Sequence, residues 1–144
     1  RFTGFDLEIE DPGIVVITFD NPGRLNASTG AMKRDLMETL TQAQMDDAVR
    51  VVLFTGAGDA FWAGDDLSGG TPDRSDAAVP PLFGGHHSPT GTYNGLRVIS
   101  QAVNTAVRDL DKPSIAAING FAITGGFELA LMCDVLLSKR QVKG

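Results

Sequence analysis

The amino-acid sequence predicts an α/β fold, built as a single domain over residues 1–144. Short apolar runs typical of buried strands alternate with longer segments whose apolar residues recur at helical spacing. Gly-rich stretches follow two of the predicted strands, where connections to the next element belong. A content of 42% hydrophobic and 21% charged residues is typical of a chain that buries a core.

The first predicted element is a β-hairpin. FDLEIE (5–10) alternates apolar and acidic residues, and DPG (11–13) has the composition of a turn. IVVITF (14–19) is a continuous apolar run, so the second strand should be the more buried of the two.

A helix and a third strand are expected next. The helix should end near Asp46, and its apolar stripe is formed by Met32, Leu36, Met37 and Leu40. VVLFT (51–55) has the pattern of a buried strand, and the Gly-rich segment 56–70 is expected to leave it as a loop.

Residues 68–94 hold most of the prolines, which predicts a long, irregular and mobile loop. A second helix follows it, with an apolar face formed by Leu96, Ile99, Val103, Ala106, Val107 and Leu110. Lys112-Pro113 should end this helix, because the residue before a proline disfavours helical geometry.

The last predicted elements are a strand, a turn and a third helix. SIAAI (114–118) is the strand, NGFAITGG (119–126) the turn, and the helix should run from about Gly126 to Val135. The tail 138–144 shows no pattern of its own.

Charge and cysteine content narrow the function classes. The formal net charge is −6 and most Lys and Arg residues are scattered, which argues against nucleic acid as the main partner. The longest apolar runs are too short to span a bilayer, so no membrane partner is predicted. A single cysteine, Cys133, permits no internal disulfide and favours a reducing, cytoplasmic location.

Both Gly-rich corners, GAGDAFWAGDDL (56–67) and NGFAITGGFELA (119–130), follow an apolar strand. In an α/β sheet this puts them at the carboxyl ends of strands, where ligands usually bind. The first corner lacks a dinucleotide fingerprint, because Phe61 stands where the third glycine is required. No Lys follows in the manner of a phosphate-binding loop.

Glu128 falls in the first turn of the third predicted helix, on the side that carries Leu131, Met132 and Val135. One interpretation is a helix-start acid that interacts favourably with the helix dipole. The other is a carboxylate removed from water among apolar side chains, which suits general acid–base catalysis near neutral pH. The glycines beside it would let backbone N–H groups approach a ligand.

These motifs carry a family resemblance. GAGDAFWAGDDL together with KPSIAAINGFAITGGFELALMCD (112–134) resembles the enoyl-CoA hydratase/isomerase (crotonase) family, and NPGRLNA (21–27) matches its first CoA-contacting corner. The resemblance runs from about Phe5 to Leu137. It implies a crotonase-like ββα spiral core that lacks the family's C-terminal helical part.

The resemblance also implies a site. An acyl-CoA thioester carbonyl would accept hydrogen bonds from the backbone N–H groups of Asp65 and Gly125, and Glu128 would be the catalytic acid/base. The residues expected along the substrate's CoA moiety are Arg24, Leu25, Ala63, Gly64, Asp66 and Leu67. No cofactor is expected, since coenzyme A is part of the substrate. No metal is expected either, because His86 and His87 have no carboxylate or thiol at ligand spacing.

The chain departs from the family pattern at its end. Family hydratases carry a second glutamate after the Cys-Asp pair, whereas CDVLLSKRQVKG (133–144) supplies no second acid. The reaction therefore stays open between hydration or isomerisation in fatty acid metabolism and the family's hydrolase, decarboxylase and dehalogenase reactions. A truncated, non-catalytic acyl-CoA-binding or assembly homologue is the alternative. The resemblance further implies a homotrimer or hexamer, and uncovered apolar surface predicts self-association.

Overall fold

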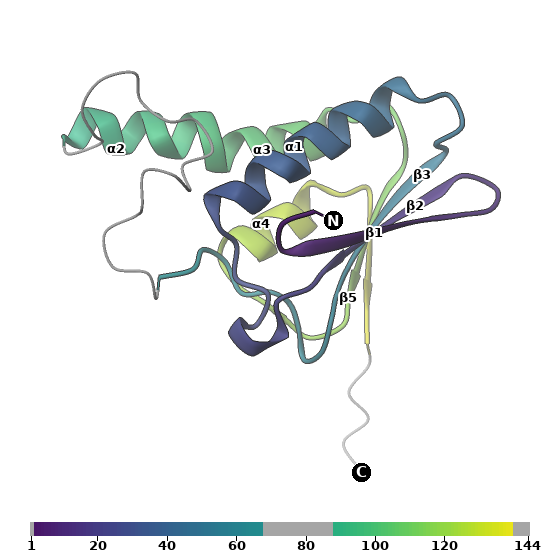
Figure 1. Ribbon diagram of the computed structural model, residues 1–144, viewed down its shortest axis with the longest axis horizontal. Coiled ribbons are helices and arrows are strands. Elements are labelled where there is room, and N and C mark those ends of the chain that lie inside the picture. Colours follow the sequence, from purple (N-terminus) through teal and green to yellow (C-terminus); the bar gives the residue numbers. More distant parts are fainter. Residues whose placement is uncertain (1, 68–87, 140–144) are drawn as a thin grey trace, which may run out of the picture.

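The computed structural model describes residues 2–67 and 88–139. Its main sheet has five strands in the order β1-β2-β3-β5-β7. Strands β1, β2, β3 and β5 are labelled in Figure 1. These strands are β1 (Phe5–Glu10), β2 (Ile14–Phe19), β3 (Val51–Gly56), β5 (Ser114–Ile118) and β7 (Val135–Ser138). Only the β1–β2 pair of this sheet is antiparallel. The predicted α/β pattern opened by a hairpin is therefore confirmed.

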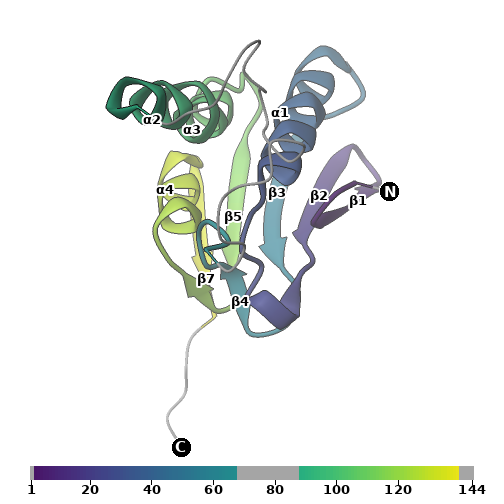
Figure 2. The same cartoon turned by 60° about the vertical axis from the view of Figure 1, so that its left-hand side comes forward.

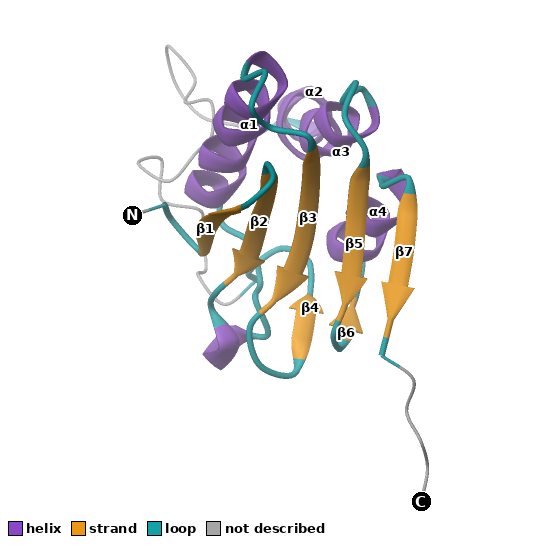
Figure 3. Ribbon diagram, turned by 90° about the vertical axis from the view of Figure 1, so that its right-hand side faces the viewer, coloured by secondary structure: helices purple, strands orange, loops and turns teal. Residues whose placement is uncertain are grey.

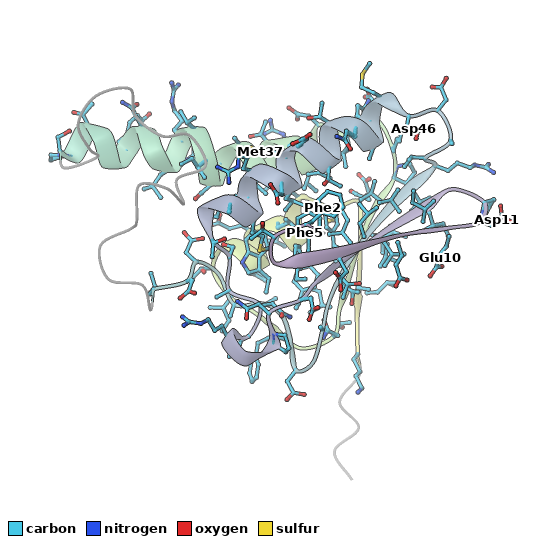
Figure 4. All side chains as sticks on the ribbon, in the orientation of Figure 1. Phe2, Phe5, Glu10, Asp11, Met37 and Asp46 are labelled. Atoms are coloured by element: carbon cyan, nitrogen blue, oxygen red, sulfur yellow. The ribbon has the colours of Figure 1, made fainter. Side chains whose placement is uncertain are left out.

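The relative burial of the two hairpin strands also follows the prediction. Val15, Ile17 and Phe19 of β2 are buried, whereas β1 buries only Phe5. The reason is position in the sheet, since β2 is hydrogen-bonded on both sides and β1 lies at the edge. Phe2 stacks on Phe5 with ring centroids 5.0 Å apart, and Figure 4 shows this pair beneath α1.

Apart from the short 3-10 helix Pro22–Arg24, which follows β2, the described helices lie on one side of the main sheet (Figure 3). They are α1 (Gly30–Met45), α2 (Pro89–Gly95), a π-helical segment (Leu96–Ser100), α3 (Gln101–Arg108) and α4 (Gly125–Met132). In Figure 2, α1 lies over β2 and β3, and α4 lies beside β5 and β7. The Thr29 side chain caps α1 by accepting a hydrogen bond from the Met32 N–H at 3.2 Å. None of the helices in the ranges 2–67 and 88–139 has the length and apolar character that crossing a membrane requires.

The hydrophobic core lies between these helices and the sheet. Phe54 of β3 and Leu36 of α1 are completely buried within it. The predicted stripe on α1 is confirmed for Met32, Leu36 and Leu40, and the helix ends at Met45, next to the predicted end.

The prediction of a plain loop over 56–70 was wrong in part. Ala60–Trp62 forms a strand, β4, which pairs in parallel with β6 (Phe121–Ala122) inside the predicted turn 119–126. This small second sheet lies beyond the carboxyl ends of β3 and β5 (Figure 3). Two and three residues are too few to show a strand period, and each strand exists only because the other supplies its hydrogen bonds.

The predicted end of the third helix at Val135 was also wrong. The helix α4 stops at Met132, and Val135 begins β7. Asp134 causes the change of direction, because its carboxylate accepts the Ser114 N–H at 2.8 Å and its own N–H donates to the Ser114 carbonyl at 3.0 Å. The apolar run after the helix is thereby paired with β5.

The predicted loop 68–94 is only partly described. Residues 68–87 lie outside the described residues, whereas Pro89–Gly95 is helical and continues into the π-helical segment and α3. The Ser88 hydroxyl accepts the Gly91 N–H at 3.0 Å, which is a helix-start bond. Of the predicted tail 138–144, residues 140–144 lie outside the description.

Candidate functional site

A cavity of about 480 Å³ lies where the two Gly-rich corners meet α1, the π-helical segment and α3. Its lining residues are Lys33, Trp62, Ala63, Asp65, Leu67, Leu96, Ser100, Val103, Asn104, Ile123, Thr124, Gly125 and Glu128. The structure thus brings Asp65, Gly125 and Glu128 to one cavity although they come from two separate corners.

Two asparagines hold the first corner. Asn26 is buried, and its Nδ2 donates to the carbonyls of Ala57 at 2.9 Å and Ala60 at 2.8 Å. Asn119, from the second corner, donates to the carbonyls of Gly58 at 2.9 Å and Ala60 at 3.1 Å. These bonds satisfy carbonyl groups that a loop would otherwise leave without partners, and they tie one corner to the other.

Ser28 sets the orientation of the Asp65 backbone. The Ser28 N–H donates to the Gly64 carbonyl at 2.8 Å, and the Asp66 N–H donates to the Ser28 carbonyl at 2.9 Å, in an isolated parallel bridge. In such a bridge the N–H of the middle residue points away from the partner strand. The Asp65 N–H accordingly faces away from Ser28, and it has no acceptor among the residues that the structure describes.

The second N–H group belongs to Gly125, the first residue of α4. The first N–H groups of a helix have no partner inside it and carry the positive end of the helix dipole. Next to it, the Gly126 N–H donates to the Ile123 carbonyl at 3.0 Å and the Glu128 N–H to the Thr124 carbonyl at 2.9 Å. The Gly125 N–H donates to no group in the described part of the chain.

The two corners touch at glycines. A side chain on Gly64, whose φ is +89°, would overlap the Thr124 hydroxyl, and one on Gly126 would overlap the Trp62 carbonyl. Trp62 also donates from its indole Nε1 to the Gly64 carbonyl at 2.9 Å. Thr124 itself has φ 46° and ψ −116°, a conformation that costs a β-branched residue free energy. The close approach of the corners is therefore tightly specified.

The expectation that Glu128 is removed from water was wrong. Glu128 lines the cavity and is exposed, and Leu131, about one turn further along α4, is exposed as well. The buried side of α4 instead carries Leu129 and Ala130. The Glu128 carboxylate is oriented by Asn104 of α3, whose Nδ2 donates to Oε2 at 3.0 Å.

Lys33 and its ion pair with Asp65 were missed in the sequence. The Lys33 ammonium lies 2.6 Å from Oδ1 of Asp65 and donates to the Ser100 hydroxyl at 3.0 Å. The Ser28 hydroxyl donates to the same Oδ1 at 3.0 Å. Its position in the sequence could have indicated it, because Lys33 precedes Leu36 by three residues and therefore lies on the apolar stripe of α1.

The residues expected along a CoA moiety differ in exposure: Arg24, Leu25 and Leu67 are exposed, whereas Gly64 is buried. Arg24 donates from Nη1 to both carboxylate oxygens of Asp66 at 3.1 Å. The Ala63 N–H donates to the Leu25 carbonyl at 3.0 Å. Only Ala63 and Leu67 of this predicted set line the cavity.

Within 2–67 and 88–139, no three or more His, Cys, Asp or Glu residues lie together in a way that could hold a metal ion. His86 and His87 lie outside the described residues.

Comparison with known proteins shows which family the sequence resembles. The sequence model of a family described as enoyl-CoA hydratase/isomerase matches residues 10–143. The "Probable enoyl-CoA hydratase 1, peroxisomal" of Arabidopsis thaliana is 40% identical over 134 residues, which are 93% of this chain and 44% of the relative. The "1,2-epoxyphenylacetyl-CoA isomerase" of Escherichia coli is 34% identical and is matched over 96% of this chain and 49% of its own length.

Solved structures show the same fold. An enoyl-CoA hydratase from Bacillus anthracis superposes with a TM-score of 0.75 at 29% identity, covering 94% of this chain and 47% of that one. A structure described as a probable enoyl-CoA hydratase from Mycobacterium smegmatis gives a TM-score of 0.76 at 27% identity, covering 93% and 48%. The predicted crotonase-like core is confirmed, and the chain spans less than half the length of these relatives.

Proposed function

The chain belongs to the enoyl-CoA hydratase/isomerase family, and from this membership we propose that the protein acts on the thioester of an acyl-CoA by hydratase- or isomerase-type chemistry. The observation that carries the proposal concerns one cavity, which is lined by Asp65, Gly125 and Glu128. The N–H groups of Asp65 and Gly125 have no acceptor among the described residues, and Glu128 supplies a carboxylate. The names of the Arabidopsis and E. coli relatives support the same class of substrate.

In the proposed reaction, the N–H groups of Asp65 and Gly125 donate to the thioester carbonyl oxygen. Removal of a proton from the α-carbon, or addition of water at the β-carbon, moves an electron pair toward this oxygen and creates an enolate. Donors that already point at the developing charge stabilise it without reorganisation, and each is worth about 2.7–4 kcal/mol in comparable sites. The dipole of α4 adds to the effect at Gly125.

Glu128 is the proposed acid/base. In isomerisation its carboxylate takes the α-proton, the electron pair of the broken C–H bond delocalises onto the carbonyl oxygen, and the proton returns at another carbon. In hydration the carboxylate takes a proton from water as the oxygen bonds to the β-carbon, and the protonated Glu128 then gives this proton to the α-carbon of the enolate. The bond from Asn104 at 3.0 Å holds the carboxylate in place for either step.

The remaining parts of the proposal concern the rest of the substrate and the assembly. The CoA moiety would lie along Arg24, Leu25 and the segment from Ala63 to Leu67, and it makes a separate cofactor unnecessary.

We propose a homotrimer or hexamer, supported by the apolar side chains that β7 leaves exposed. A cytoplasmic location is proposed on the lone cysteine, although the name of the Arabidopsis relative places that protein in the peroxisome.

The test is Glu128→Gln, which keeps the size and hydrogen bonding of the side chain and removes its basicity. We expect it to slow hydration of a short trans-2-enoyl-CoA, and exchange of the α-protons of a saturated acyl-CoA in D₂O, by about 10²–10⁴-fold. The dissociation constant of the saturated acyl-CoA should change by less than about threefold, because Glu128 contributes chemistry and little binding. Prior dialysis against a chelator should leave both rates unchanged.

The matched control is Glu38→Gln on α1, an exposed glutamate whose carboxylate accepts a hydrogen bond from Gln42 and does not line the cavity. It should keep full activity. If the unmutated protein binds the acyl-CoA but shows neither hydration nor proton exchange, the non-catalytic acyl-CoA-binding alternative is the better description. If it does not bind acyl-CoA at all, both functions are excluded.

A further inference from the structure

Asp65 presents an electrostatic problem at the proposed site. Its backbone N–H is one of the two proposed donors to the thioester oxygen, yet its side chain carries a carboxylate and the residue lines the cavity. A negative charge this close to a developing enolate opposes the reaction, and water screens only part of the repulsion, because the Asp65 side chain is 49% exposed. A residue that contributes a donor through its backbone would function better with a neutral side chain.

The structure places a cation directly on that carboxylate. The Lys33 ammonium is 2.6 Å from Oδ1 of Asp65, and the Lys33 side chain is only 8% exposed. Lysine is rarely buried to this extent unless it is paired. Ser100 accepts a second bond from the ammonium, and Ser28 donates to the same carboxylate oxygen, so both charges are held in one geometry.

Lys33 has no substitute in this role. The charged residues that line the cavity in the described part of the chain are Lys33, Asp65 and Glu128, so Lys33 is its one cation there. Arg24 is engaged with Asp66 and does not line the cavity. Without Lys33, the cavity would present two carboxylates to a substrate oxygen that becomes negative.

We propose that Lys33 compensates charge at the oxyanion site: its ammonium cancels the charge of the Asp65 carboxylate, while the backbone bridge to Ser28 sets the direction of the Asp65 N–H. This inference rests on the proposed function. Lys33 acts through Asp65 and does not touch the reacting atoms. The Lys33–Asp65 ion pair thus adds two side-chain charges to a site whose proposed donors are backbone N–H groups.

The test uses cinnamoyl-CoA, an enoyl thioester with an aryl group in conjugation. Its absorption moves to longer wavelength when the carbonyl is polarised, so the red shift of the bound ester reports the donors without requiring turnover. Lys33→Met keeps the length and apolar stem of the side chain and removes the charge. We expect it to reduce the red shift to less than about half and kcat by about 10–100-fold, with KM within about threefold.

The decisive variant is Lys33→Met combined with Asp65→Asn. Removal of both charges should restore most of the red shift and of kcat, whereas a purely structural role of Lys33 predicts no restoration. An undiminished red shift in Lys33→Met, or no recovery in the double variant, overturns the inference. The matched control is Arg108→Met, which removes a 61% exposed cation paired with Asp109 away from the cavity and should change neither quantity.

Folding is checked by circular dichroism for each variant. If Lys33→Met does not fold, Asp65→Asn alone decides: with the carboxylate gone and Lys33 present, the red shift should equal or exceed that of the unmutated protein, and a smaller shift overturns the inference. Failure of the proposed function gives a different result, because the unmutated protein would then bind cinnamoyl-CoA without any red shift.

Discussion

Two parts of the molecule carry similarly apolar strands but differ in how these are covered: the well-covered end, β2 and β3 with α1, and the less covered end, β7 with α4. In β2 and β3, Ile17 and Phe54 are 0% exposed. In the edge strand β7, Val135, Leu136 and Leu137 are 44–53% exposed, and among the described residues β7 pairs only with β5. Apolar composition thus specifies that a segment forms a strand, while neighbouring elements decide whether its side chains are removed from water.

The candidate site draws on both ends. The well-covered end supplies Lys33 from α1, and the loop after β3 leads to Asp65. The less covered end supplies Gly125 and Glu128 from α4. The comparison predicts that substitutions of the buried apolar side chains at the first end mainly affect folding, whereas those of exposed side chains at the second affect catalysis and association.

The largest effect is expected from Phe54→Ala. This change removes a fully buried ring from the core and should lower the free energy of unfolding by about 3–5 kcal/mol. Leu137→Ala, at a side chain already 53% exposed, should cost less than about 1 kcal/mol. Chemical denaturation of both variants measures the difference, and equal losses would contradict it.

A smaller effect is expected from Gly126→Ala. The added methyl group would overlap the Trp62 carbonyl, so the corners must separate, at a cost of about 1–3 kcal/mol. Gly125→Ala is the matched control, because its nearest neighbour in the described residues would be 4.0 Å away. Alanine there favours the helix by up to about 1 kcal/mol and keeps the proposed N–H donor. Thermal unfolding with acyl-CoA titration separates the two variants, and equal destabilisation would contradict the prediction.

Leu136→Lys should change stability by less than about 0.5 kcal/mol, since the side chain is half exposed. Its expected effect is on association, because a charge in the exposed strand β7 opposes edge-to-edge and face-to-face contact. Light scattering over a range of protein concentrations should show less self-association than in the unmutated protein. An unmutated protein that is monomeric at every concentration would disprove the underlying expectation.

The smallest effect concerns Cys133, between α4 and β7. Burial raises the pKa of this thiol to about 12, because a thiolate would lose hydration there. Alkylation by iodoacetamide at pH 8 should be at least about 100-fold slower than in the urea-unfolded chain.

The alkaline stability of the protein follows from the same pKa shift. The neutral thiol is favoured by folding, so its contribution is complete below the unfolded pKa of 9.0 and is lost as pH rises toward about 12. Cys133→Ala should remove the part of the decrease in unfolding free energy at alkaline pH that comes from this thiol. Rapid alkylation at pH 8 would show that the less covered end is open to solvent throughout.

The sequence predicted the long elements and failed at the short ones. The hairpin, α1, β3 and β5 each contain enough residues to show a period or a continuous apolar run. The strands β4 and β6 do not, and they form because two distant corners meet. The end of α4 was misjudged for a related reason, since Asp134 bonds to Ser114, twenty residues earlier in the chain.

Within the site, the sequence determined which residue types are available: the glycines at both corners, Asp65 and Glu128, and through their motif the family. The tertiary structure decided the environment of each. Glu128 is exposed because the opposite side of α4 faces the core, and Lys33 meets Asp65 because α1 packs over the first corner. Burial and charge pairing depend on which surfaces come together in space. The amino-acid sequence specifies these contacts only through the fold, so it does not show them directly.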